Sequence, residues 1–359
     1  MRLGIIGLPQ SGKTTLFNAV TRGSQPTGAI TGKIEIHDAV VDVPDGRVDA
    51  LTEMFKPRKK IYAKVNYADI AGLDGSAGKS GISGELLNKL AQMDGFILVA
   101  RAFENDQVVH PAGSVDPERD IRTMEGEFIL NDLVACEKKL ERLSDERRKG
   151  GGRDKALIDR EIELFGRLRG TLEEEKPLRG LTLTADEEKT ISGYGLLSRK
   201  PVLILVNLDE TQPVPVISYR QDQTRIDFFR AKIEMELAQM APEDAAIFMN
   251  EYGIAELGLD RVIKLSYDLL DQMSFFTAGE DECRAWTVRK NATAPEAAGV
   301  IHTDLQKGFI RAEVLAYDDL MTLGSYAEAK AKGKLRLEGK EYRVKDLPKI
   351  GRASCRERV

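Results

Sequence analysis

Short apolar runs alternate along the chain with segments of helical periodicity, a pattern typical of an α/β protein. The runs Leu3–Leu8, Phe96–Ala100 and Pro201–Val206 are apolar at almost every position, which predicts buried strands of a parallel sheet. Lys64–Asp69 alternates between polar and apolar residues and ends in an acid, so it predicts a strand with a carboxylate at its C-terminal end. Together these segments predict a mostly parallel sheet.

Between residues 117 and 175 the apolar positions recur at three- and four-residue steps, as on one face of a helix. They form two groups, Ile129, Leu133, Cys136, Leu140 and Leu143, and then Leu157, Ile158, Ile162, Phe165 and Leu168. A glycine-rich break separates the groups, which predicts two antiparallel helices inserted between strands of the sheet.

The break between these helices carries a cluster of basic side chains: Arg147, Arg148, Lys149, Arg153 and Lys155. Such a cluster can bind the phosphates of RNA. It can equally be a solvated turn between two helices, and the sequence favours neither interpretation.

The chain changes character after Phe275, where short alternating segments are punctuated by glycines and acids. This pattern predicts a small α+β domain, in which Trp286 is expected to be a core residue. The last segment, Ile350–Val359, resembles the translation of a common sequencing adapter. We therefore expect residues 350–359 to be an artefactual tail that does not belong to the fold.

The composition is that of an ordinary globular protein. The chain has 359 residues, 42% hydrophobic and 31% charged, which allows two or three domains. Its formal net charge of -5 argues against a surface built to bind naked nucleic acid. No apolar run reaches the ~18 residues of a membrane helix, and the N-terminus lacks the pattern of a signal peptide. Three cysteines without close spacing fit a reducing cytoplasm: Cys136, Cys283 and Cys355.

The first apolar run leads directly into the pattern G-x-x-x-x-G-K-[ST], in the order strand, loop, helix. The pattern is formed by Gly7, Leu8, Pro9, Gln10, Ser11, Gly12, Lys13 and Thr14, and Thr15 continues into the predicted helix. Glycines let the backbone turn its N–H groups toward phosphates, and a helix N-terminus adds partial positive charge. Lys13 supplies a full charge at the β and γ oxygens, and the Thr14 hydroxyl can bind Mg²⁺. The chain therefore predicts a P-loop nucleotide hydrolase.

A second phosphate element is expected at the end of the strand Lys64–Asp69, where Asp69 opens the pattern D-x-x-G. Asp69 would hold Mg²⁺ through water, and the Gly72 N–H would contact the γ-phosphate. The alternative is a simple aspartate at a strand end. Leu73 stands where Ras-type proteins carry a glutamine that orients water, so the water-positioning group must come from elsewhere.

The strand Pro201–Val206 is followed by Asn207, Leu208, Asp209 and Glu210, where a GTPase carries N-K-x-D. The aspartate of that element accepts hydrogen bonds from guanine N1–H and its 2-amino group. Here Glu210 replaces it, and adenine offers neither donor, so we expect ATP to bind at least as well as GTP. The alternative is that Asp209 or Glu210 still reaches guanine. His110, beyond the strand Phe96–Ala100, is expected near the same edge of the sheet.

These features together resemble the Obg-like ATPase (YchF) family of translation-factor-related P-loop proteins. The resemblance extends from Met1 to about Asp346, and its most specific motifs are Asp69–Leu73, Ser274–Gly279, Arg284–Thr287, Thr293–Asp304 and Lys307–Val314. It implies a nucleotide-binding domain over residues 1–115 and 198–274, an inserted helical coiled-coil domain over residues 116–197, and a ubiquitin-like TGS domain over residues 275–348. It also implies ATP hydrolysis with Mg²⁺ and association with ribosomes.

The resemblance assigns roles to individual residues as well. His110 matches a histidine proposed to be catalytic in the family, and Asn207 with Glu210 matches its N-x-x-E specificity element. Ala231 matches the element that backs the base, where Arg230–Ala231 replaces Ser-Ala. The phosphate loop departs from the family's Asn-Val before Gly-Lys-Ser, because this chain has Gln10–Ser11 and Thr14. The switch-I threonine that binds the metal is expected to be Thr31, with Thr27 as the alternative.

The predicted function is a regulatory ATPase that acts on ribosomes, possesses a slow intrinsic rate and is a cytoplasmic monomer. We expect it to bind neither membranes nor specific DNA sequences. In the predicted mechanism, Lys13 and Mg²⁺ neutralise charge while His110 or a partner positions the attacking water. Two alternatives remain: a GTP-specific translation-type GTPase, and an adaptor that binds nucleotide without hydrolysing it.

Overall fold

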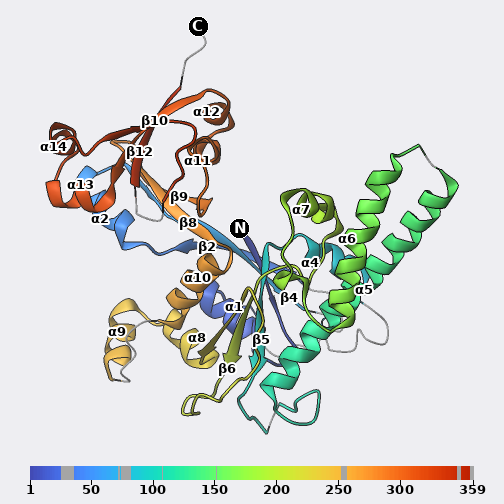
Figure 1. Ribbon diagram of the computed structural model, residues 1–359. Coiled ribbons are helices and arrows are strands. Elements are labelled where there is room, and N and C mark those ends of the chain that lie inside the picture. The colour runs from blue at the N-terminus through green and yellow to red at the C-terminus, as the bar shows by residue number, and fades with distance from the viewer. Residues whose placement is uncertain are drawn as a thin grey trace. The chain divides into compact units, whose positions relative to one another are not determined.

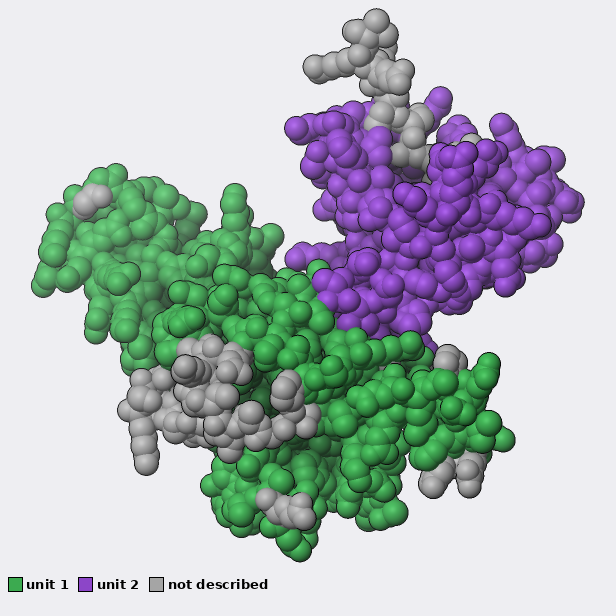
Figure 2. Space-filling view, turned by 180° about the vertical axis from the view of Figure 1, so that it is seen from behind, with its two compact units in different colours: residues 1–39, 66–262 green, residues 40–65, 263–359 purple. Residues whose placement is uncertain are grey.

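The computed structural model describes residues 1–25, 36–71, 73, 82–106, 108–150, 152–251, 257–345 and 349–355. The chain divides into two compact units (Figure 2). The first contains residues 1–39 and 66–262, and the second contains residues 40–65 and 263–359. The sequence did not predict that residues 40–65 would join the C-terminal unit.

The predicted parallel sheet forms, with six strands in the order β2-β4-β1-β5-β6-β7 (Figure 1). Its strands are β1 (Arg2–Ile6), β2 (Ile36–Val43), β4 (Ala63–Ile70), β5 (Gly95–Arg101), β6 (Val202–Asn207) and β7 (Thr224–Phe229). The pairings of β1 with β4 and β5, of β5 with β6, and of β6 with β7 are all parallel. Their C-terminal ends therefore meet at one edge, where ligands of open α/β sheets bind.

The helices of the first unit flank this sheet and form the insertion. They are α1 (Lys13–Thr21), α4 (Gly84–Ala91), α5 (Pro117–Lys149), α6 (Lys155–Glu173), α7 (Ala185–Ile191), α8 (Ala231–Gln239) and α9 (Pro242–Glu251), with 3-10 turns at Leu178–Gly180 and Ser192–Tyr194. The helix α10 (Gly258–Leu269) leads into the second unit. No helix in the described part of the chain is long and apolar enough to cross a membrane.

The insertion is the predicted helical hairpin, with α5 and α6 side by side (Figure 1). The Asp116 side chain caps α5 by accepting from the Arg119 N–H, and Gly150 ends the helix in a left-handed conformation. Most of the predicted apolar face is buried between the helices, although Leu157 is half exposed. At its root, α5 packs on the sheet through Phe128, whose ring centroid is 4.9 Å from that of Phe96.

Four of the five basic side chains at the hairpin tip form ion pairs with acids. Arg147 contacts Asp159 at 2.6 Å, and Arg148 and Lys149 share Asp145. Arg153 pairs with Glu146 and Glu161. Since these acids neutralise much of the positive charge, the structure favours a solvated turn over an RNA-phosphate surface at this tip.

Two buried acids fix the root of α5 to the sheet domain. Glu125 accepts from both terminal nitrogens of Arg179, whose side chain is fully buried, and from the Tyr219 hydroxyl. Asp132 accepts from the Leu197 N–H at 2.9 Å and from the Ser198 N–H and hydroxyl, each at 2.7 Å. Each acid is fully hydrogen-bonded, as a buried charge requires.

The second unit is the predicted α+β domain, to which residues 40–65 add the helix α2 and the strand β3. Its sheet has the order β11-β10-β12-β8-β9-β3, from β3 (Lys59–Ile61), β8 (Gln272–Ala278), β9 (Glu282–Arg289), β10 (Phe309–Ala316), β11 (Arg336–Glu338) and β12 (Lys349–Cys355). Its helices are α2 (Gly46–Phe55), α11 (Ala294–Ile301), α12 (Thr303–Lys307), α13 (Tyr317–Leu323) and α14 (Tyr326–Ala331). The segment expected to lie outside the fold thus contributes β12, which pairs with β10 and β8.

Candidate functional site

The loop between β1 and α1 requires glycine at two positions, Gly7 and Gly12. Gly7 has φ of +148°, and an added Cβ would lie 2.4 Å from the Val99 carbonyl oxygen. Gly12 has φ of +98°, and its Cβ would lie 2.3 Å from Asn207 Nδ2. Pro9 and Gln10 form the outer turn, where Gln10 has φ of 62°. The predicted phosphate loop is therefore held against β5 and β6 by close backbone approach.

Lys13 begins α1 and turns its ammonium group back into this loop. Its Nζ donates to the carbonyl oxygens of Gly7 at 2.9 Å and Leu8 at 2.8 Å. Burial lowers the pKa of Lys13 to about 8, and the charge of Asp69 opposes this shift only in part. A buried cation with incomplete charge compensation suits an anionic ligand.

Thr14 and Asp69 come together as predicted for a metal site. Asp69 lies opposite Ile5 in the parallel pairing of β4 with β1, which places it beside the start of α1. The Thr14 hydroxyl donates to Asp69 Oδ2 at 2.8 Å, whereas the buried Asp69 Oδ1 has no hydrogen-bond partner among the described residues. Burial raises the pKa of Asp69, opposed by the Thr14 hydrogen bond and the charge of Lys13.

These oxygens fit Mg²⁺, which prefers a few carboxylate and hydroxyl ligands and completes its shell with phosphate and water. The unpartnered Asp69 Oδ1 is the atom that makes the fit good, because a cation would remove the cost of burying it. Ser11 Oγ is a second buried oxygen in the loop without a partner in the described chain. Thr15 lies in the first turn of α1, in line with its predicted position.

Asn207 connects the phosphate loop with the element expected to back the base. Its Nδ2 donates to the Ser11 carbonyl oxygen at 3.1 Å, and its Oδ1 accepts from the Ala231 N–H at 3.1 Å. Both ends of this buried amide are thus used within the protein. Leu208 is also buried, in the core beside the sheet, so only its backbone could contact a nucleotide.

Glu210 stays at the surface, where its Oε1 lies 2.6 Å from Lys232 Nζ. Arg230 fixes the loop that carries Glu210. Its Nε donates to the carbonyl oxygens of Asp209 and Glu210, and its Nη2 donates to that of Gln212. The sequence did not predict that Arg230 and Lys232 belong to the site. The only signal was that Arg230 stands where the resembled family carries a serine.

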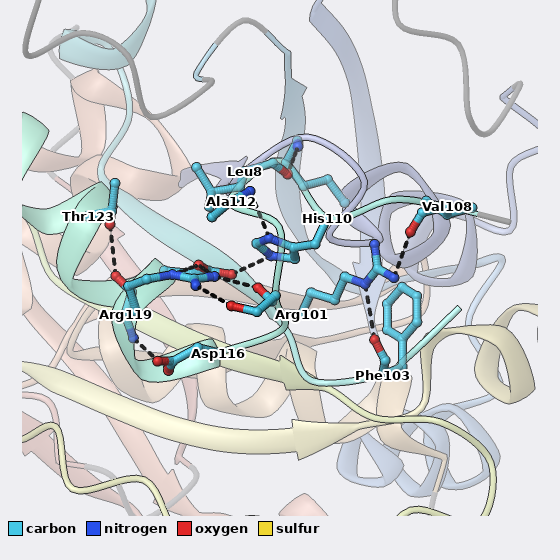
Figure 3. A network of polar contacts seen from close by, with 12 residues as sticks. Leu8, Arg101, Phe103, Val108, His110, Ala112, Asp116, Arg119 and Thr123 are labelled. Carbon is cyan, nitrogen blue, oxygen red and sulfur yellow. Dashed lines mark hydrogen bonds and ion pairs between the residues drawn. The ribbon is translucent and has the colours of Figure 1, made fainter. Parts of the chain in front are cut away.

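His110 lies in the loop that follows β5, and its ring is held on both sides (Figure 3). Nδ1 accepts from the Ala112 N–H at 3.1 Å, so the proton resides on Nε2, which donates to Asp120 Oδ2 at 2.8 Å. The residue is only 6% exposed. In this arrangement neither nitrogen is free to hold a water molecule. Leu73 is buried in the same core cluster as Leu8, while Thr27, Thr31 and Gly72 lie outside the described residues.

A family profile named YchF-GTPase_C, described as a protein of unknown function (DUF933), matches residues 272–348. The chain is 40% identical over 355 residues to the ribosome-binding ATPase YchF of Bacillus subtilis, with 96% of each chain covered. It is 37% identical to Obg-like ATPase 1 of Oryza sativa subsp. indica, covering 96% of this chain and 90% of the relative.

The chain belongs to the YchF/Obg-like ATPase family. A solved YchF structure agrees throughout its length: the Schizosaccharomyces pombe YchF GTPase has a TM-score of 0.81 and 30% identity, with 99% of this chain and 97% of that chain covered. Family membership and the phosphate-loop geometry together identify a P-loop nucleoside triphosphate hydrolase. The YchF relatives are named both ATPase and GTPase, so the base must be judged from this chain's own residues.

Proposed function

We propose that this protein is a cytoplasmic, Mg²⁺-dependent ATPase that binds ribosomes and whose nucleotide state controls that binding. The observation that carries the proposal is the meeting of the buried Lys13 ammonium with the Thr14–Asp69 pair, which leaves one carboxylate oxygen free. Ribosome binding is proposed from the printed names of the bacterial relatives, which include ribosome-binding ATPases from Bacillus subtilis and Escherichia coli O157:H7.

The phosphate loop and Asp69 would neutralise the charge of the triphosphate. Lys13 would exchange its two loop carbonyls for β and γ oxygens, so that the charge developing on the γ-phosphoryl group is countered. Thr14 and Asp69, with Thr31 of switch I, would hold Mg²⁺, which when bound neutralises phosphate charge. Gly72 remains the proposed backbone contact to the γ-phosphate.

ATP is proposed over GTP because of the base-reading loop. Asn207 makes one hydrogen bond from each end of its amide, to Ser11 and Ala231, so it supports the loop that carries the base-reading residues. The Glu210 carboxylate, which replaces the guanine-reading aspartate, is paired with Lys232, and Asp209 Oδ1 accepts from the Glu210 N–H. Without a free acceptor for guanine N1–H and its 2-amino group, the site does not bind GTP in preference to ATP as GTPases do.

His110 is proposed as the group that positions the attacking water. It can do so only after one ring nitrogen leaves its partner, Ala112 or Asp120, since both ring nitrogens are engaged. We therefore expect slow hydrolysis by the protein alone.

Multiple-turnover phosphate release with ATP and with GTP, each with and without Mg²⁺, tests the proposal. We expect release that requires Mg²⁺, favours ATP and disappears in Lys13→Ala. One charge-assisted contact to phosphate contributes about 3 kcal/mol, so Lys13→Ala should also weaken nucleotide binding on the order of 100-fold. Negligible ATP turnover beside efficient GTP turnover would identify a GTPase, and binding without turnover would identify an adaptor.

Ribosome binding needs its own measurement. Co-sedimentation with ribosomal subunits should differ between ATP, a non-hydrolysable ATP analogue and ADP. The same small amount of protein in the pellet under all three conditions would contradict nucleotide-controlled binding.

A further inference from the structure

We infer that Asp120 is a positioning residue that holds the His110 ring in an inactive orientation, in which neither ring nitrogen can bind water. We call this the stored arrangement. The inference rests on the proposed role of His110 in hydrolysis. It concerns the first turn of α5 and not the phosphate loop.

Asp120 is the centre of a polar network whose other members, His110 and Arg119, are labelled in Figure 3. Its Oδ2 accepts from His110 Nε2 at 2.8 Å, and its Oδ1 accepts from Arg119 Nε at 3.1 Å and Nη2 at 2.8 Å. Arg119 in turn donates to the hydroxyl and carbonyl oxygens of Ser114, at 2.9 Å and 2.7 Å. The loop between His110 and α5 is thereby tied to the helix that follows it. Both Asp120 and His110 are almost fully buried.

A second arginine fixes the beginning of the same loop. Arg101, at the end of β5, donates from Nε to the Phe103 carbonyl oxygen at 3.0 Å and from Nη2 to that of Val108 at 2.9 Å. Burial lowers the pKa of Arg101, and the charge of Asp120 opposes that shift. The Asp120 carboxylate thus binds His110 and Arg119 directly, while Arg101 holds the start of the loop through backbone carbonyls.

The position of the loop makes storage of His110 relevant to the nucleotide site. Arg101 is the register partner of Asn207, and the Val99 carbonyl lies against Gly7. The His110 loop thus leaves the sheet at the edge that holds the phosphate loop.

The geometry indicates restraint and not activation. In a catalytic His–Asp pair the carboxylate binds one nitrogen and the other nitrogen faces the reacting group. Here the second nitrogen accepts from the Ala112 N–H, so the ring has no atom left for water. The ring can bind water only after one of these hydrogen bonds breaks, and Asp120 holds it where the Ala112 N–H reaches its second nitrogen, which keeps the active arrangement a minor state.

Kinetics of ATP hydrolysis in Asp120→Ala, His110→Ala and the double variant tests the inference. If Asp120 stores His110, Asp120→Ala raises kcat on the order of tenfold, because a state populated at a few per cent becomes dominant, and leaves KM unchanged. In the His110→Ala background the same substitution should have no effect. Glu104→Ala, which removes an exposed acid of the His110 loop, is the matched control and should leave kcat unchanged.

The opposite results are equally clear. A fall of kcat in Asp120→Ala to the level of His110→Ala would show that Asp120 activates the ring and would overturn the inference. A rise that persists without His110 would also overturn it. If Asp120→Ala folds poorly, Arg119→Met removes the support of the carboxylate and should give a smaller rise of the same sign. Absence of ATP hydrolysis in the unmodified protein would instead overturn the proposed function.

Nuclear magnetic resonance measures the tautomer of the His110 ring directly, without ATP hydrolysis. The chain has 3 histidines, so the signal missing in His110→Ala identifies this ring. We expect a pure Nε2–H tautomer in the unmodified protein and an averaged tautomer in Asp120→Ala. An averaged ring in the unmodified protein would overturn the inference even if ATP is hydrolysed.

Discussion

The phosphate loop and the root of α5 bury polar groups in opposite ways. At the phosphate loop, Ser11 Oγ and the neighbouring Asp69 Oδ1 of β4 have no partner in the described structure, and burial has lowered the pKa of the Lys13 cation. At the root, Glu125 and Asp132 are surrounded by donors. Unsatisfied groups cost stability unless a ligand completes them, whereas satisfied groups anchor the fold. The difference separates a binding site from a structural joint.

His110 does not fit this division. It is proposed to act on water, yet its ring is satisfied on both sides like a structural group. This conflict is the reason to regard the observed arrangement as a stored one. A catalytic group that is fully partnered must exchange its partners before it works.

The largest effect is expected at the root of α5, where Glu125→Ala would leave the buried Arg179 without its carboxylate. Removal of one partner of a buried ion pair costs about 3–5 kcal/mol, so the free energy of unfolding should fall by that amount. Guanidinium chloride unfolding measures the change. Nucleotide affinity of the folded protein should stay the same, because Glu125 serves the joint and not the loop.

Glu137→Ala is a suitable comparison, since Glu137 is an exposed acid on the same helix. Its effect should stay within about 0.5 kcal/mol. Equal effects of the two substitutions would show that the root is not a structural joint.

At the phosphate loop the expected effect depends on pH. Lys13 has a pKa of about 8 in the folded protein, and a bound polyphosphate raises it because the charged form contacts the phosphates. Above pH 8, nucleotide binding must therefore take up a proton, and affinity should fall by up to about tenfold per pH unit. Calorimetry in buffers of different ionisation enthalpy measures both the affinity and the proton uptake.

The effect of Lys13 on folding stability changes with pH in the opposite direction from its effect on nucleotide affinity. Its pKa in the folded protein lies below the ordinary lysine value of 10.5, so between about pH 8 and 10.5 the unfolded chain binds more protons and the stability contributed by this group rises with pH. In Lys13→Met both pH dependences should be absent. Binding that is as tight at pH 9.5 as at pH 7.5 would contradict a buried lysine at the phosphates.

Features that depend on residues close together in the sequence could be predicted, whereas features that depend on distant contacts could not. The phosphate loop could be predicted because Gly7, Gly12 and Lys13 act through local backbone geometry and a contiguous motif. The strands and the helical hairpin could be predicted because their periodicity is local as well. Asp120 was not predicted to hold His110, since nothing in the surrounding sequence distinguishes it from other acids in a helical first turn. Joining β3 to the C-terminal sheet depends on a pairing with β9 far along the chain, which local patterns do not encode.

The smallest effect is expected at the base-reading loop, where Glu210 is partnered but exposed. An exposed ion pair is weak because water screens it, so Lys232→Ala should shift relative affinity from ATP toward GTP by only about a few-fold as the carboxylate becomes free to accept from guanine. Competition between fluorescent ATP and GTP analogues at low salt measures the ratio. The shift should shrink in high salt, disappear in the Glu210→Ala background and be absent in Lys232→Arg, which keeps the charge. A shift toward ATP would mean that Lys232 contacts guanine itself, and the loop would then belong with the unsatisfied groups of the binding site.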